Sequence, residues 1–90
     1  MLDAVRLGPL TMWLSCRAHL TRGWALLALG RPEAATDHFR SAEQLLSSTK
    51  AEGEERAAWL WVDMANGFEH AGCHAAGMNA YTNALALYDL

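Results

Sequence analysis

The chain has 90 residues, of which 52% are hydrophobic, and its formal net charge is −3. This length limits the fold to one modest domain, and the mild acidity argues against a nucleic-acid binder, which normally carries a basic face. No apolar run reaches the ~20 residues that a membrane-spanning helix needs, so we expect no membrane partner.

Residues 1–9 are predicted to form a lead-in segment that ends at the breaker Gly8-Pro9. The stretch Trp13 to Cys16 loosely matches a bacterial lipoprotein cleavage site. Asp3 lies in the supposed positive region, however, and Gly8-Pro9 interrupts the apolar part, which favours an ordinary first helix.

The first long helix is predicted over residues 10–29, where Gly23 is the only breaker. Apolar residues recur at helical spacing in two adjacent strips, one formed by Trp13, Cys16, Leu20, Trp24 and Leu27 and the other by Leu10, Leu14, Ala18, Ala25 and Leu29. Two such strips predict a helix that is covered on more than one side.

The second helix is predicted from Pro32 to about Ser48, after Gly30 as a left-handed cap. Its inward residues should be Ala35, Phe39, Ala42, Leu45 and Leu46. The polar run 47–53 then forms a connection. A third helix is predicted from Glu54-Glu55 to Ala71, because acidic residues stabilise a helix start.

The fourth helix is predicted over residues 74–88, after Gly72 as a second cap. The stretches 30–45 and 72–87 also match one another at an offset of 42 residues. The matched pairs are Gly30 with Gly72, Ala34 with Ala76, Ala35 with Gly77, Phe39 with Tyr81, Ala42 with Ala84 and Leu45 with Leu87. The sequence therefore predicts an all-α fold of two tandem antiparallel helical hairpins, with repeats over about 11–52 and 53–90 of a single domain spanning 10–90.

This pattern resembles the tetratricopeptide repeat family, in which Trp, Leu-Gly and Tyr on the first helix precede Ala and an aromatic residue on the second. The matching residues are Gly23, Leu26, Ala35, Phe39 and Ala42 in the first repeat, and Trp61, Met64, Ala65, Phe68, Gly77, Tyr81 and Ala84 in the second. The period exceeds the ~34 residues of the common form and is similar to the long variety found in bacterial regulators and signalling scaffolds. His19 and Arg22 replace the expected Trp and Leu, and we expect both to face water. The closing Pro of the family is replaced by Ser47 and Asp89.

The resemblance implies an α-solenoid whose first helices line a concave face that binds a peptide or a helix. The residues expected on that face are Arg17, Leu20, Trp24, Leu27, Trp59, Val62, Asp63, Asn66 and His70. An exposed Trp24 would be an interface anchor, whereas burial under the lead-in segment or a symmetry mate is the alternative. Asn66 stands where members that grip a C-terminal carboxylate carry Asn, but Val62 and Asp63 replace the basic neighbours of that motif.

Other chemistry finds little support in the residues. His70, Cys73 and His74, with Cys16 and His19 far away, do not form the four converging ligands of a zinc site, so we expect no metal and no cofactor. No nucleophile elbow, P-loop or metalloprotease motif is present, so we expect no enzyme. Cys16 and Cys73 should lie on the order of 20 Å apart along parallel helices and stay reduced, which fits a cytoplasmic location.

Repeat solenoids usually need about three repeats and a polar terminal cap. The side chains expected to lack a covering helix at the C-terminal end are Phe68, Tyr81, Leu85 and Tyr88. The leading hypothesis is therefore a noncatalytic protein–protein interaction module that self-associates or joins a larger complex. One alternative is a regulatory or sensor segment of a larger bacterial transcription regulator. Another is an RNA-binding helical repeat, but the mild acidity of the chain and Asp63 argue against it.

Overall fold

The computed structural model describes residues 9–48 and 55–88, and all its regular secondary structure in these ranges is α-helical. The four helices are α1 (Pro9–Ala28), α2 (Pro32–Ser47), α3 (Glu55–His70) and α4 (His74–Tyr88). The predicted all-α class is confirmed, and each predicted helix end lies within one residue of the observed one. The predicted lead-in residues 1–8 and most of the polar connection lie outside the described residues.

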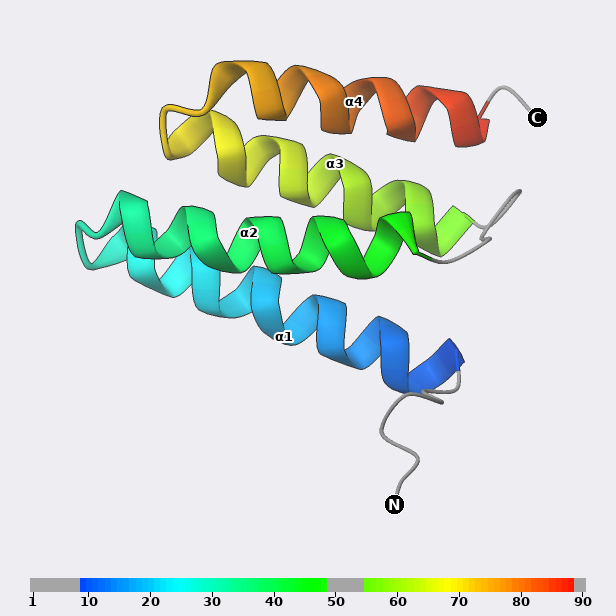
Figure 1. The fold of residues 1–90 in the computed structure, drawn as a ribbon, viewed down its shortest axis with the longest axis horizontal. Helices are drawn as coiled ribbons and strands as arrows, with labels where there is room; N and C mark the ends of the chain where they lie inside the picture. The colour runs from blue at the N-terminus through cyan, green and yellow to red at the C-terminus, as the bar shows by residue number, and fades with distance from the viewer. Residues whose placement is uncertain (1–8, 49–54, 89–90) are drawn as a thin grey trace.

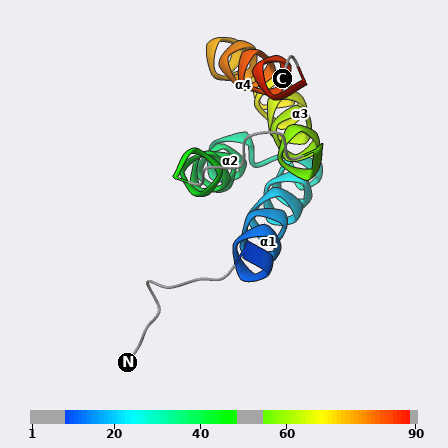
Figure 2. The ribbon, with the colours of Figure 1, turned by 90° about the vertical axis from the view of Figure 1, so that its right-hand side faces the viewer.

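The helices pack as two hairpins, α1 with α2 and α3 with α4. Figure 1 shows that α1 and α3 run in the same direction and that α2 and α4 return alongside them. The helix α3 also packs against α1 and α2, so it joins the two hairpins. Figures 1 and 2 place α1 and α4 at opposite ends of the layer, with α2 to one side of α1 and α3. The arrangement is therefore an open stack, 37 × 35 × 15 Å across, rather than a closed four-helix bundle.

The two hairpin turns have the same backbone geometry. Gly30 and Gly72 adopt φ values of 76° and 86°, which favour glycine because a Cβ is strained there. The N–H of Arg31 donates to the carbonyl of Leu26 at 2.8 Å, and the N–H of Cys73 donates to that of Phe68 at the same distance. Both turns are thus Schellman caps, as the predicted left-handed glycines require.

The core is centred on Phe39, which is fully buried between three helices. A Cβ added to Gly23 of α1 would come within 2.6 Å of its ring, and one added to Gly67 of α3 within 2.4 Å. The ring also meets that of Phe68 edge-on, with centroids 5.7 Å apart. The absence of side chains at Gly23 and Gly67 therefore lets α1 and α3 pack closely against the Phe39 ring of α2.

The inward residues predicted for α2 are confirmed, since Ala35, Phe39, Ala42 and Leu46 are buried and Leu45 is half-buried. The prediction that α1 is covered on more than one side is wrong. In its second apolar strip Leu14 and Leu29 are 56% and 71% exposed, and Ala18 and Ala25 are also exposed. The α2 and α3 helices cover the strip that begins at Trp13 and partly cover neighbouring positions such as His19 and Leu26.

Candidate functional site

A shallow groove of about 440 Å³ lies where α1 and α3 meet the solvent. We call it the groove and define it by its lining residues, which are Arg17, Arg56, Trp59, Leu60, Val62, Asp63 and Asn66. Arg17 comes from α1 and the others from α3. The volume is within the range of sites that hold small ligands or single side chains of a partner.

The apolar wall of the groove is Trp59, whose side chain is 64% exposed. Residues 56, 59, 63 and 66 follow one another at spacings of three or four, so they share one side of α3. Trp61, only two positions away, points into the core and is 6% exposed. The sequence pattern thus separates a structural tryptophan from an exposed one on the same helix.

A second, smaller hollow of about 300 Å³ is lined by Trp24, Leu27, Ala28 and His70. The half-buried Trp24 ring meets the Phe39 ring edge-on at 6.0 Å and the His70 ring at 5.2 Å between centroids. Its Nε1–H donates to Oδ1 of Asp63 at 3.2 Å. Trp24 is therefore held in place by α2 and α3 and offers a partner only part of its surface.

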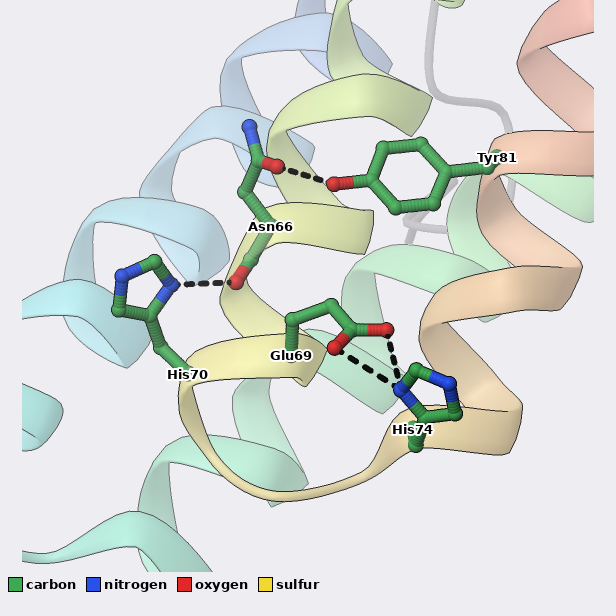
Figure 3. A network of polar contacts seen from close by, with 5 residues as sticks. All are labelled: Asn66, Glu69, His70, His74 and Tyr81. Carbon is green, nitrogen blue, oxygen red and sulfur yellow. Dashed lines mark hydrogen bonds and ion pairs between the residues drawn. The ribbon is translucent and has the colours of Figure 1, made fainter.

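Asn66 is the centre of a polar network on α3 (Figure 3). The hydroxyl of Tyr81 donates to its side-chain oxygen, and Nδ1 of His70 lies 2.9 Å from its backbone oxygen. Nearby, the carboxylate of Glu69 lies 2.9 Å from Nδ1 of His74 across the second turn. Tyr81 belongs to α4, so this network fixes the groove side of α3 to the second helix of its hairpin.

The structure brings most of the predicted partner-binding residues together, in two neighbouring sets. Arg17, Trp59, Val62 and Asn66 line the groove, and Trp24, Leu27 and His70 line the second hollow. The assignment of Leu20 to this face is wrong, because Leu20 is 2% exposed and belongs to the core. Its position on α1 lies where α2 and α3 both approach.

Sequence analysis missed Arg56, which also lines the groove. The signal was present, since Arg56 precedes Trp59 by three positions and Asp63 by seven on a helix already predicted there. The groove therefore carries two basic side chains, the expected Arg17 of α1 and Arg56 in the first turn of α3.

The residues predicted to be uncovered at the C-terminal end have different environments. Leu85 is 62% exposed, and Tyr81 is half-buried with its hydroxyl bonded to Asn66. The assignment of Phe68 to that end is wrong, because Phe68 is fully buried against Phe39 and under the guanidinium of Arg40, 5.8 Å from its ring centroid. The side chain of Tyr88 lies outside the described residues.

The two cysteines are free thiols in different surroundings. Burial raises the pKa of Cys16 to about 12, and the nearby charge of Asp63 adds to the effect. A thiol with that pKa stays protonated and unreactive at neutral pH. Cys73 is half-buried with its sulfur 3.5 Å from the Thr36 hydroxyl.

The expectation that His19 faces water is wrong. His19 is half-buried, and its Nδ1 lies 3.1 Å from Nδ1 of His38 on α2. Burial lowers the pKa of His19 below its usual 6.5, and the neighbouring His38 and Arg22 lower it further. One ring must therefore be a neutral acceptor and the other a donor. Arg22 itself is exposed, as expected.

The histidines and cysteine around the second turn do not converge on one point. His70 pairs with the backbone of Asn66, His74 with Glu69, and Cys73 with Thr36. Within residues 9–48 and 55–88, no three metal-binding side chains of the types His, Cys, Asp and Glu come together.

None of the helices in the described ranges combines the length and apolar character that crossing a bilayer demands. Comparison of the chain with protein-family models, with curated proteins and with solved structures finds no match.

Proposed function

We propose that this chain is a noncatalytic interaction module, similar to tetratricopeptide repeats, which holds a peptide or helix of a partner protein against α1 and α3. The observation that carries the proposal is the groove with the exposed Trp59 in its wall. Aromatic and arginine side chains are over-represented among residues that dominate binding energy at protein interfaces. Among the described residues, the tryptophan Trp59 and the arginines Arg17 and Arg56 line the groove.

The open stack supports the same proposal. In repeat solenoids each first helix contributes to one continuous surface, and α1 and α3 run in the same direction with the groove between them. The side chains around the groove are also held from behind. Trp24 is bonded to Asp63 and Asn66 to Tyr81, so Asp63 and Asn66 would lose little conformational entropy on binding.

We further propose that the module assembles with a second copy or a larger partner through α4. Met78 and Leu85 of this helix are 54% and 62% exposed. Burial of such side chains stabilises by ~1.5–3 kcal/mol each.

The test of the groove is a comparison of three proteins as bait for crosslinked partners: wild type, Trp59→Ala and Leu29→Ala. Leu29 is a matched control, because it is 71% exposed and lies in the turn between α1 and α2, outside the lining of the groove. We expect Trp59→Ala to weaken capture at least tenfold, as is usual for a central aromatic anchor. Equal capture by all three proteins would place the interface elsewhere.

A further inference from the structure

The polar groups of the groove are mostly hydrogen-bond donors without a partner. Within the described residues, the guanidinium groups of Arg17 and Arg56 form no hydrogen bond and no ion pair. The indole N–H of the exposed Trp59 is also without an acceptor there. Among the described lining residues Asp63 is the one carboxylate, and one of its oxygens accepts from Nε1–H of Trp24. The described lining residues therefore carry more positive than negative charge, on a chain whose formal net charge is −3.

The amide of Asn66 is turned so that it adds a further donor. Its oxygen accepts the hydroxyl proton of Tyr81, and Figure 3 shows its nitrogen pointing away from that ring. In this arrangement the phenol donates and the amide oxygen accepts, so the contact holds the amide with its NH₂ group turned away from Tyr81. The NH₂ group of Asn66 is left for a ligand that accepts hydrogen bonds.

We propose that the groove binds an internal acidic segment of a partner protein, with a side-chain carboxylate held by Arg17 and Arg56 and an adjacent apolar residue packed on Trp59. The inference rests on the proposed function and names the chemistry of the partner. Guanidinium groups pair with carboxylates by strong, charge-assisted hydrogen bonds. Tyr81 acts as a positioning residue, because it reaches the ligand only through the amide of Asn66.

An internal acidic segment fits the groove better than a basic or neutral segment or a free chain terminus, for chemical reasons. A basic or neutral segment would leave both guanidiniums without an opposite charge, and desolvating an unpaired charge is costly. A free chain terminus would also supply a carboxylate, but it would place no residue beyond the acid. The groove is open to solvent, as a segment that continues beyond the acid in both directions requires.

The first experiment selects peptides from a random library displayed as internal segments on phage, with the wild-type protein as bait. We expect enrichment of Asp or Glu next to a large apolar residue. Enrichment of neutral or basic peptides would overturn the proposal. The enriched sequence is then synthesised with an amidated C-terminus. Its binding supports an internal carboxylate, whereas binding only of the free-acid form would overturn it.

The second experiment measures the dissociation constant of the amidated peptide by fluorescence anisotropy for Arg17→Gln, Arg56→Gln and Arg31→Gln. Arg31 is a matched control, because it is an exposed arginine outside the groove whose replacement changes the net charge equally. We expect the two groove variants to bind roughly three- to tenfold more weakly and the control to bind as wild type. Equal losses in all three would show a general charge effect and overturn the proposal.

The third experiment tests the positioning role with Tyr81→Phe, which keeps the ring and removes the hydroxyl. The readout is discrimination between the acidic peptide and the same peptide with Asn or Gln in place of the acid. We expect discrimination to fall by roughly two- to fivefold, because the freed amide can turn its oxygen toward the ligand. A purely structural role would weaken both peptides alike, and unchanged discrimination would remove Tyr81 from the proposal.

Failure of this inference and failure of the proposed function give different results. If the selected peptides are neutral or basic but bind the Trp59→Ala protein more weakly than wild type, the proposed function is retained and the inference of an acidic partner is wrong. If no selected peptide responds to Trp59→Ala, both are wrong. Thermal unfolding of every variant, compared with wild type, checks that the fold is retained.

Discussion

Phe39 is the residue on which the packing of the whole stack depends. Its ring lies between Gly23 and Gly67, so α1 and α3 approach it without side chains of their own. Helix propensity alone would favour alanine over glycine at both positions by ~1 kcal/mol. The glycines are therefore retained in the helices for a steric reason.

We predict that Gly67→Ala destabilises the fold by about 1–3 kcal/mol, because its Cβ would lie 2.4 Å from the Phe39 ring. The measurement is urea denaturation. Phe39→Leu serves as the second site of a double-mutant cycle, and we expect the smaller side chain to recover part of the loss. Gly77→Ala is the comparison, and we expect a smaller loss, since its Cβ would lie 3.0 Å from the flexible carboxylate of Glu69 and 3.2 Å from the backbone oxygen of Ala65. A Gly67→Ala protein as stable as wild type would contradict this steric account.

His19 gives a second prediction at this scale. Its pKa in the folded chain is lowered from 6.5, so the unfolded chain takes up this proton more readily. Stability from His19 is thus fully present above pH 6.5 and is lost as the pH falls toward the lowered value. We expect the melting temperature of wild type to fall more steeply over this window than that of His19→Gln. Parallel pH profiles of the two proteins would contradict a lowered pKa of His19 in the folded chain.

At the scale of single elements, the two turns allow a matched comparison. Both capping glycines have positive φ, and a Cβ added at either would meet nothing within 4 Å. The cost of Gly30→Ala and of Gly72→Ala is therefore backbone strain alone, about 1–2 kcal/mol in each case. We expect the two costs to agree in thermal or urea unfolding, and Asn to cost less than Ala at both sites. Unequal costs would mean that the turns differ in ways that their geometry does not show.

The ends of the helices were predicted closely from the sequence, whereas the burial of individual side chains was predicted less well. Gly30, Pro32 and Gly72 fix helix ends by local backbone chemistry, which a sequence displays directly. The depth of Leu20 or Phe68 depends on where a second hairpin crosses the first. Helical spacing gives the face of a residue but not the neighbour that covers it. The face with Arg17, Trp59, Val62 and Asn66 was expected from the family resemblance, and helical spacing puts Arg56 on the same side of α3 although it was not named.

At the scale of the whole molecule, the two second helices differ where their surroundings differ. α2 is covered by α3, whereas no helix in the described residues lies beyond α4. At equivalent positions Phe39 is replaced by Tyr81, whose hydroxyl finds Asn66. Polar residues Thr36 and Glu43 of α2 correspond to the exposed Met78 and Leu85 of α4. The α4 surface is therefore more apolar than its counterpart, although it lacks a neighbour.

This contrast supplies the variant that tests assembly. Met78→Thr combined with Leu85→Glu transfers the α2 residues to α4 at positions that are already exposed, so the fold should be retained. If α4 is an assembly surface, wild type should associate at micromolar concentration and the double variant should be monomeric, as measured by size-exclusion chromatography with light scattering. Leu14→Glu is the control, because Leu14 is 56% exposed on α1 at the opposite end. A monomeric wild type, or equal dissociation by the control, would show that α4 does not mediate self-association.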